Sequence, residues 1–365
     1  METRDLSSHT VYRAGRGVEE VARDLGLDPE SLVKLSSNEN PHGPSPKAVE
    51  AIRESADGVH RYPKTAHVDL TAKLADRHGV APEQVWLTPS ADAALDYLAR
   101  AVIEPGQRVL TPTPGFAYYP MSARYHHGEV DEYELSKAED FAQTPGTVLD
   151  SYDGQRVVYV TSPHNPTGSE LSVEDLRTVA AETDDETLVV YDEAYIHFSE
   201  SPSAIPVVDD RDDVAVVRTF SKAYGLAGTR LGYAVVPEAW ADAYARINTP
   251  FGVTVPTLAA GLAALDDDAH VEKSVETARW AREYLHDHLD ARTWESGGNF
   301  VLCEVGDASA VADACQHRGV IVRDCSSFGL PKCIRVTCGT REETERAVET
   351  INDVLAEVDD ACASP

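Results

Sequence analysis

The sequence predicts an α/β protein with a large, mainly parallel sheet covered by helices on both faces, followed by a smaller C-terminal α/β unit. Its length of 365 residues exceeds one ordinary domain. Several short runs stay apolar throughout, as strands buried on both faces do, and helical stretches separate them. Polar side chains follow the ends of these runs, where open α/β sheets bind ligands. The runs are Val85–Leu87, Arg108–Thr111, Arg156–Thr161, Thr187–Tyr191 and Val214–Val217.

The charge balance is strongly acidic, with 62 Asp and Glu against 32 Lys and Arg and a net charge of −30. Nucleic acid is therefore excluded as a partner, because phosphate backbones require clustered cations. We expect the acidic runs 183–186, 209–213 and 266–268 to be solvated loops and helix ends. Acidity spread along the whole chain indicates a halophilic protein, since at molar salt the Debye length is only ~3 Å and such a surface stops repelling itself.

Neither a membrane nor an oxidising compartment is indicated. No apolar run approaches the ~20 residues that a membrane helix needs. The first residues, METRDLSSHT, lack the apolar core of a signal peptide. The six cysteines fall late in the chain without CxxC spacing, which favours reduced thiols over disulfides or a metal site. We expect a cytoplasmic protein with no membrane partner and no metal.

Three regions follow one another along the chain. Residues 1–35 are expected to form an N-terminal arm that packs with the small domain and contains one short helix and the strand 32–35. Residues 36–248 carry the apolar runs and form the large domain. Residues 249–365 form the small domain, with a long amphipathic helix near 271–289, strands at 299–305, 320–323 and 333–337, and a last helix whose apolar face runs from Ala347 to Val358.

Two segments of the large domain are rich in turn-forming or small residues. The segment 35–46, LSSNENPHGPSP, is rich in turn residues and is expected to be a loop before a helix over 46–55. After the strand 85–87, small residues lead into a helix that begins near Asp92. A helix N-terminus offers free N–H groups and a positive dipole end, which suit a phosphate. Many strand–helix joints share this composition, so the phosphate site stays one of two interpretations here.

One lysine follows a buried strand in a setting that suggests chemistry. Lys222 comes after the run 214–217, with Thr219 and Ser221 before it and Arg230 eight residues after it. An amine beside hydroxyls and a guanidinium suits a cofactor that has both an aldehyde and a phosphate, because the amine forms a Schiff base and the others neutralise the phosphate. A lone lysine at such a place is more often an ordinary surface residue; this lysine is not alone.

An aspartate also follows a buried strand directly. Asp192 comes after the run 187–191 and is therefore expected in a low-dielectric environment, where it needs a cationic or donor partner. A protonated pyridine nitrogen would be such a partner. A buried structural aspartate is the alternative, and the spacing of thirty residues to Lys222, with strands between, counts against it.

The stretch RTFSKAYGLAGTRLGY, residues 218–233, closely resembles the lysine segment of the fold-type I aminotransferases, which depend on pyridoxal 5′-phosphate (PLP). The loop SPHNPTG at 162–168 and the segment LSSNENPHGPSP carry the same resemblance, as do YDEAYIHF at 191–198 and the Pro-Gly-Phe at 114–116. Within these enzymes the chain is most similar to the histidinol-phosphate aminotransferases. The resemblance covers nearly the whole chain, with its motifs in the family's order.

The resemblance implies a set of PLP-binding residues. Lys222 would hold the cofactor and act as the base, Asp192 would pair with the pyridine nitrogen, and Tyr195 would bond to the phenolic oxygen and help lower the Schiff-base pKa. Phe116 would stack on the ring, and Asn165 would also bond to the phenolic oxygen. The phosphate would be held by backbone N–H groups and side chains at Ala91, Asp92, Thr219, Ser221 and Arg230.

The resemblance also implies a partner subunit and a substrate site. Tyr62 would reach the cofactor phosphate of the partner subunit, so a homodimer with shared active sites is expected. Arg323 and Arg335 match the family's anion-binding pair, Tyr12 matches its N-terminal tyrosine, and Asn38 lies in the segment that lines the mouth of the site.

The implied reaction is transamination of L-histidinol phosphate with 2-oxoglutarate, giving imidazole-acetol phosphate and glutamate in histidine biosynthesis. The alternatives are a threonine-phosphate decarboxylase, a broad aromatic aminotransferase, or a PLP-fold regulator that has lost catalysis. The intact set of Lys222, Asp192, Tyr195 and Arg230 disfavours the last. The chain departs from the family pattern at Ala93, Ser162 and His164.

Overall fold

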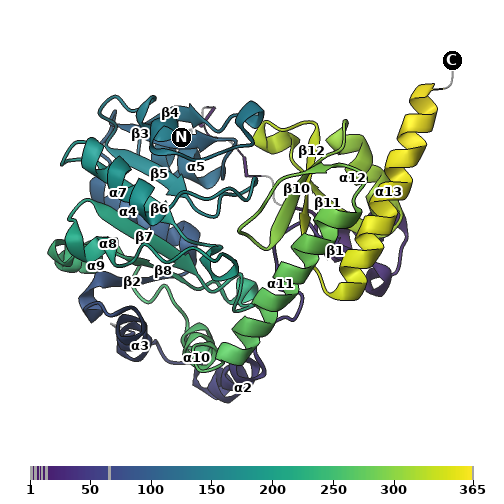
Figure 1. Ribbon diagram of the computed structural model, residues 1–365. Helices are drawn as coiled ribbons and strands as arrows, with labels where there is room; N and C mark the ends of the chain where they lie inside the picture. The colour runs from purple at the N-terminus through teal and green to yellow at the C-terminus, as the bar shows by residue number, and fades with distance from the viewer. Residues whose placement is uncertain are drawn as a thin grey trace.

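The computed structural model describes residues 3, 6–7, 9, 11–12, 15–64 and 67–363, with side chains as far as Glu357. The remaining residues of the expected N-terminal arm lie outside this part of the chain. Two separate sheets, each covered by helices, make up the molecule (Figure 1). No helix within the described residues is both long and apolar enough to cross a membrane.

The larger sheet in the described chain has seven strands in the order β2-β8-β7-β6-β5-β3-β4. Neighbouring strands are parallel except at β8, which runs antiparallel to both β2 and β7. This mainly parallel sheet confirms the fold class expected from the sequence. The strands are β2 Val85–Thr88, β3 Arg108–Thr113, β4 Glu129–Glu134, β5 Val157–Thr161, β6 Leu188–Asp192, β7 Val214–Thr219 and β8 Gly232–Val235.

The smaller sheet in the described chain has five strands in the order β1-β11-β12-β10-β9. The first strand comes from the N-terminal part of the chain and runs parallel to β11, with Leu35 opposite Val322. The N-terminal segment thereby joins the sheet built from the C-terminal third. The strands are β1 Val33–Leu35, β9 Arg292–Thr293, β10 Phe300–Glu304, β11 Val320–Asp324 and β12 Cys333–Thr337.

The helices alternate with the strands along the large sheet and then cover the small one (Figure 1). Short 3₁₀ turns join several of them. The α-helices are α1 Val18–Leu25, α2 Pro46–Ser55, α3 Val68–His78, α4 Ala91–Val102, α5 Tyr118–Tyr125, α6 Pro145–Leu149, α7 Val173–Glu182, α8 Val207–Asp210, α9 Ala241–Ile247, α10 Val255–Ala264, α11 Asp268–His288, α12 Ala308–His317 and α13 Arg341–Ala363.

The central strands of the large sheet are apolar because both of their faces are covered. Every residue of β5, β6 and β7 is buried. Along β7, Val217 packs into a core cluster with α4, α5 and α9, whereas Val216 packs into a second cluster with α3, α7, α8 and α10. Alternate side chains of one strand thus enter two cores, so an uninterrupted apolar run is required.

Strand β4 of the large sheet was not predicted from the sequence. Strand β4 has the sequence EVDEYE, with three glutamates and one aspartate, and it pairs with β3 at the edge of the sheet. Tyr133 is the fully buried side chain of this strand. An edge strand needs only one covered side, so its sequence lacks the apolar run that marks the central strands.

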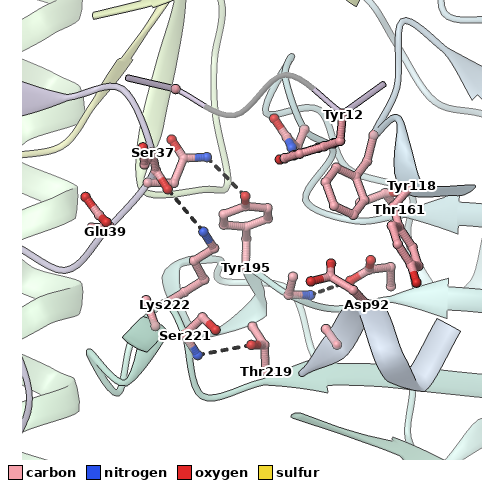
Figure 2. Close-up of a pocket in the computed structure, with 18 of the residues that line it drawn as sticks. Tyr12, Ser37, Glu39, Asp92, Tyr118, Thr161, Tyr195, Thr219, Ser221 and Lys222 are labelled. Atoms are coloured by element: carbon pink, nitrogen blue, oxygen red, sulfur yellow. Dashed lines mark hydrogen bonds between the residues drawn. The ribbon is translucent and has the colours of Figure 1, made fainter. Parts of the chain in front are cut away.

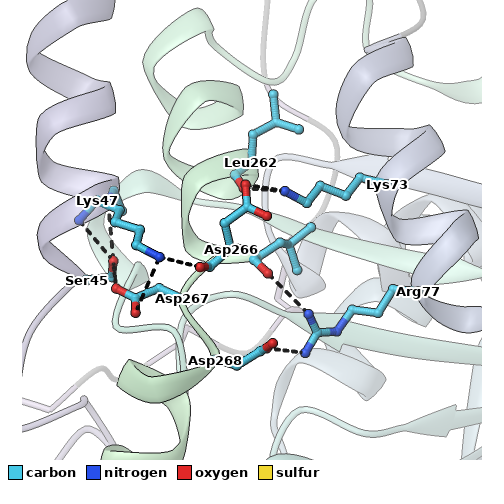
Figure 3. A network of polar contacts seen from close by, with 10 residues as sticks. Ser45, Lys47, Lys73, Arg77, Leu262, Asp266, Asp267 and Asp268 are labelled. Atoms are coloured by element: carbon cyan, nitrogen blue, oxygen red, sulfur yellow. Dashed lines mark hydrogen bonds and ion pairs between the residues drawn. The ribbon is translucent and has the colours of Figure 1, made fainter.

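The acidic run Asp266–Asp268 lies at the start of α11, a helix end as expected, and it also forms contacts that were not predicted. Asp266 pairs with Lys73 of α3 at 2.5 Å, and Asp268 pairs with Arg77 of the same helix at 2.7 Å. Asp267 accepts a hydrogen bond from Ser45, the N-cap of α2 (Figure 3). These contacts attach the start of α11, the helix that reaches from α2 and α10 to the small sheet, to the large domain (Figure 1).

Candidate active site

A cavity of about 610 Å³ lies at the carboxyl ends of the central parallel strands, between the two sheets. Its walls come from distant parts of the chain: the loops after β5, β6 and β7, the N-terminus of α4, the segment after β1, and strands β11 and β12. The lining includes Lys222 and Asp192 on the large-sheet side and Arg323 and Arg335 on the small-sheet side, with Tyr12 from the N-terminal part (Figure 2).

Lys222 points into this cavity from the loop after β7 (Figure 2). Its Nζ donates to the carbonyl oxygen of Ser37 at 3.3 Å and lies 5.5 Å from the centre of the Tyr195 ring. The Tyr195 hydroxyl in turn accepts from Nδ2 of Asn38 at 3.0 Å. No carboxylate forms an ion pair with Lys222 within the described chain, so the amine is available to a ligand.

Asp192 lies on the cavity wall at the end of β6 and is 4% exposed. Its Oδ1 accepts from the backbone N–H of Ala194 at 2.9 Å, and its Oδ2 accepts from the hydroxyl of Tyr119 at 2.8 Å. Burial raises the pKa of this carboxyl to about 6, and the two hydrogen bonds oppose that rise. Tyr119 reaches Asp192 from α5 and was not among the residues expected at the site.

The N-terminus of α4 forms one end of the cavity. Ser90 caps the helix by accepting from the N–H of Ala93, while the N–H groups of Ala91 and Asp92 have no acceptor among the described residues. Arg230 lies opposite, and its Nη2 donates to Oδ2 of Asp92 at 2.9 Å. Two free N–H groups, a guanidinium and the helix dipole form an anion-binding environment.

Strand β8 and the hydroxyl side chains of Thr219 and Ser221 complete the end of the cavity at α4. A Cβ atom added to Gly232 would lie 2.4 Å from the nitrogen of Ala91, so glycine is needed for the strand to approach the helix start this closely. Thr219 and Ser221 line the same cavity, and the Thr219 hydroxyl accepts from the N–H of Ser221 at 3.0 Å.

Arg335 lies at the opposite end and is 5% exposed. Its Nη1 donates to Oδ1 of Asn165 and its Nη2 to the carbonyl oxygen of Ser36. Its Nε is buried without a partner, and no carboxylate forms an ion pair with Arg335 among the described residues. Burial lowers the pKa of its guanidinium. Buried cations are normally paired, so an anionic ligand is the expected counter-ion.

Arg323 lies directly across the strand pair from Arg335. Its Nη2 donates to Oγ of Ser327 at 3.1 Å, and its guanidinium stands 5.4 Å from the centre of the Phe328 ring. Arg335 stands 6.0 Å from the same ring. Phe328 therefore lies beside both cations, and this contact was not expected from the sequence. Like charges directly opposite each other destabilise a sheet, which makes this end attractive to an anion.

The aromatic residues expected at the site divide into two groups. Phe116 lines the cavity, with its edge against Tyr119 at 5.6 Å between ring centres and with Tyr12 at 6.1 Å. Tyr62 does not line the cavity. It is 81% exposed and stacks on Phe251, with ring centres 4.6 Å apart.

Two of the three departures from the family pattern have structural roles in the chain. At Ala93 only the backbone takes part, since its N–H binds the Ser90 cap, and nothing in the structure explains the alanine side chain. The Ser162 hydroxyl bridges to the backbone of Leu171. The ring of His164 is fully buried and shares a 2.8 Å hydrogen bond with Thr167. Burial lowers the pKa of His164 to about 3, so this imidazole is neutral at physiological pH.

Comparison with known proteins places this geometry in a family. Residues 30–351 match the family "Aminotransferase class I and II". A histidinol-phosphate aminotransferase of Haloarcula marismortui is 70% identical over 98% of this chain and 99% of that protein. The chain belongs to the histidinol-phosphate aminotransferases. One from Natronomonas pharaonis is 66% identical, over 97% of this chain and all of that protein.

Solved structures agree with the family assignment. A histidinol-phosphate aminotransferase of Sinorhizobium meliloti, solved with pyridoxal 5′-phosphate, superposes with a TM-score of 0.88 at 26% identity, over 98% of both chains. The resemblance inferred from the sequence is thereby confirmed. The protein is a PLP-dependent aminotransferase of fold type I. The relatives from Haloarcula marismortui and Natronomonas pharaonis come from halophilic archaea.

The cavity fits PLP in the chemistry of its donor groups. An amine without a carboxylate partner, a buried carboxyl, and a helix N-terminus with free N–H groups beside a guanidinium lie around one space. These match an aldehyde, a ring nitrogen and a phosphate, respectively.

Proposed function

We propose that this enzyme transfers the amino group of L-histidinol phosphate to 2-oxoglutarate, yielding imidazole-acetol phosphate and glutamate in histidine biosynthesis. The observation that carries this substrate class is the pair of opposed arginines at the end of the cavity away from α4. Arg335 is buried there without a carboxylate partner among the described residues, and Arg323 lies across from it. A dianionic phosphate ester is a suitable counter-ion for two cations.

The residues on the large-sheet side would hold the cofactor and move the proton. PLP supplies a carbonyl carbon that reacts with amines and a ring that accepts electrons from Cα of the substrate. Asp192 would bind the ring nitrogen and Lys222 would hold the aldehyde end. Lys222 would then take the proton from Cα through its Nζ, acting as a general base. Tyr195, oriented by the hydrogen bond from Asn38, would bond to the phenolic oxygen.

Residues around the cavity would complete the cofactor site. Phe116 would stack on the ring and Asn165, held by Arg335, would bond to the phenolic oxygen. The phosphate would lie at the free N–H groups of Ala91 and Asp92, with Arg230 beside it. Thr219 and Ser221 would donate the remaining hydrogen bonds.

The substrate end would use one common and one selective cation. Arg335 would bind the substrate phosphate in one half-reaction and the α-carboxylate of glutamate in the other. Arg323 would act mainly on the phosphate, which has more charge and more acceptor oxygens than a carboxylate. Tyr12, which faces Phe116, would assist from the N-terminal segment. Burial raises the pKa of the Tyr12 hydroxyl, and this keeps it a donor.

The half-reaction tests this proposal directly. The yellow enzyme is mixed with L-histidinol phosphate in molar KCl without an acceptor, and absorbance is followed. We expect conversion to the pyridoxamine form, and recovery of the original spectrum on addition of 2-oxoglutarate. Release of CO₂ from threonine phosphate, with no spectral response to histidinol phosphate, would assign the decarboxylase function. Comparable rates with phenylalanine or tyrosine would assign a broad aromatic aminotransferase.

We further propose that the enzyme is a cytoplasmic homodimer with shared active sites. Tyr62 and Phe251 support this proposal, since their exposed stacked rings form an apolar surface outside the cavity. In the dimer Tyr62 would reach the cofactor phosphate of the other subunit. Sedimentation should give twice the chain mass, and Tyr62→Ala should weaken PLP binding. A monomer with full activity would contradict the proposal.

The domain division at 35/36 and 248/249 also remains part of the proposal. The first strand of the small sheet, β1, comes from the N-terminal region, in keeping with an arm that packs on the small domain. Helix α10 follows residue 249 but packs with α2 and the core of the large sheet. Limited proteolysis with mass spectrometry would locate the flexible junctions.

A further inference from the structure

The surroundings of Asp192 contain a chain of hydroxyl groups that the expected catalytic set does not include. The Tyr119 hydroxyl lies 2.8 Å from Oδ2 of Asp192 and 2.7 Å from Oγ1 of Thr161. Tyr119 is 1% exposed and Thr161 is 3% exposed, so water does not compete for these contacts. The three side chains come from α5, β5 and β6.

The direction of these hydrogen bonds follows from the chemistry of the groups. An ionised carboxylate only accepts, so the Tyr119 O–H donates to Asp192. The single proton of the phenol is then used, and the Thr161 hydroxyl donates to the Tyr119 oxygen. Each donor strengthens the next one, since a phenol that accepts a hydrogen bond becomes a better donor. This hydrogen-bond relay, from Thr161 through Tyr119 to Asp192, therefore favours the negative charge on Asp192.

The ring of Tyr119 is fixed by its neighbours. It stacks on Tyr159 with ring centres 4.8 Å apart and planes within 15°, and it meets Phe116 edge to face at 5.6 Å. A ring held on two sides places its hydroxyl at one position. The same ring also links the Asp192 carboxylate to Phe116, the aromatic expected to stack on the cofactor.

The charged groups around Asp192 make such a donor necessary. No cation of the described chain forms an ion pair with it, and the nearby carboxylates of Asp92 and Glu193 raise its pKa further, in addition to the effect of burial. Among the described residues, the one other donor to this carboxyl is the backbone N–H of Ala194. Tyr119 itself stays protonated, because burial and Asp192 raise the pKa of its hydroxyl.

We propose that Tyr119, supported by Thr161, is a positioning residue that keeps Asp192 ionised and directed at the pyridine nitrogen of PLP. The inference rests on the proposed role of Asp192. It predicts that cofactor affinity and its dependence on pH change when the Tyr119 hydroxyl is removed.

Tyr159 provides a matched control for this test. It is the stacking partner of Tyr119, is equally buried, and its hydroxyl has no hydrogen-bond partner in the described chain. Tyr119→Phe and Tyr159→Phe therefore remove the same atom from the two rings of one stack. Only the first removes a donor to Asp192. Thr161→Val removes the second donor of the relay and keeps the branched shape.

The experiment measures PLP binding to the apoenzymes by equilibrium dialysis between pH 5.5 and 8.5, with the melting temperature as a folding check. Loss of one hydrogen bond to a charged group predicts about ten- to a hundredfold weaker binding for Tyr119→Phe. As the pH is lowered, the PLP affinity of Tyr119→Phe should begin to fall at a higher pH than that of the parent enzyme, because the Asp192 carboxyl protonates more readily without the Tyr119 donor. Thr161→Val should show a smaller change in the same direction, and Tyr159→Phe should bind like the parent.

The Asp192→Asn variant distinguishes a wrong role for Asp192 from a wrong role for Tyr119. If Asp192→Asn binds PLP like the parent at every pH, the proposed role of Asp192 is wrong and the inference falls with it. If Asp192→Asn loses affinity while Tyr119→Phe keeps the parental affinity and pH profile, only the role of Tyr119 is wrong. An equal loss in Tyr119→Phe and Tyr159→Phe would assign both hydroxyls to packing and would also overturn the inference. None of these readouts depends on the identity of the amino donor.

Discussion

Removing the two opposed arginines one at a time should affect the two half-reactions differently. Arg335 is buried and fixed by Asn165 and Ser36, so it is in place before any ligand arrives. Arg323 lies on the neighbouring strand, and its guanidinium is held against Phe328. We expect Arg335→Ala to impair both substrates and Arg323→Ala to impair mainly histidinol phosphate.

The magnitude follows from the contacts that are lost. A hydrogen bond to a charged group contributes about 1.5–3 kcal/mol, which corresponds to about ten- to a hundredfold in affinity. Arg323→Ala should lower kcat/KM for histidinol phosphate by this factor and change that for glutamate by less than about threefold. Arg335→Ala should reach the upper end for both substrates, because it also leaves the Asn165 amide without its buried partner. Arg335→Lys should recover only part of the loss, since an ammonium cannot bind two oxygens in a fixed fork.

The assay is the single-turnover rate of each half-reaction in molar KCl, with histidinol phosphate or glutamate as the amino donor. Arg53→Ala is the matched control, because it removes the same charge from a side chain on α2 that is 72% exposed and outside the cavity. It should leave both rates unchanged. Equal losses for both donors in Arg323→Ala would refute this division of roles. So would an Arg335→Ala enzyme that loses only one substrate.

Three further predictions concern the cofactor, the salt response and the core. Lys222→Ala should fold and retain PLP without a covalent bond but show no turnover, and turnover at the parental rate would contradict the assignment. Stability measured by thermal unfolding should rise steeply from dilute buffer to molar KCl, since screening relieves the repulsion behind the net charge of −30; a flat melting temperature would point to another cause of the acidity. Glu193→Gln should lower the free energy of unfolding, measured with urea, by about 3–5 kcal/mol. Arg218 is 8% exposed and lies 2.7 Å from Glu193, so the substitution leaves it as an uncompensated buried charge. A loss below about 1 kcal/mol would show that the site is hydrated.

Site residues next to apolar runs could be predicted from the sequence alone. Lys222 and Asp192 each follow a strand that is buried along its whole length, and the ends of parallel strands meet at one edge of a sheet. The residues that hold Lys222 and Asp192 in place could not be predicted in this way. Tyr119 reaches Asp192 from 73 positions away, and nothing in the sequence around it distinguishes a donor to a carboxylate from an ordinary core tyrosine.

The acidic runs show the same limit on the surface. Composition and spacing predict solvated loops and helix ends at 209–213 and 266–268. The structure adds specific partners: Asp210 pairs with Arg177, Asp213 with Arg211, and Asp268 with Arg77, 191 positions away. Counting charges gives the net field of the molecule, but it does not reveal which carboxylates have a cation beside them.

The sequence by itself determined the fold class, the positions of the central strands and the cofactor family, because a strand buried on both faces must be apolar and the motifs that carry the resemblance follow such strands. The tertiary structure decided which side chains complete the site. Arg335 is held by Asn165 and Ser36, which are 170 and 299 positions away along the chain. Contacts of this kind form only when two sheets close around one cavity. Local residue patterns specify each strand, whereas the meeting of distant strands depends on the packing of the whole chain.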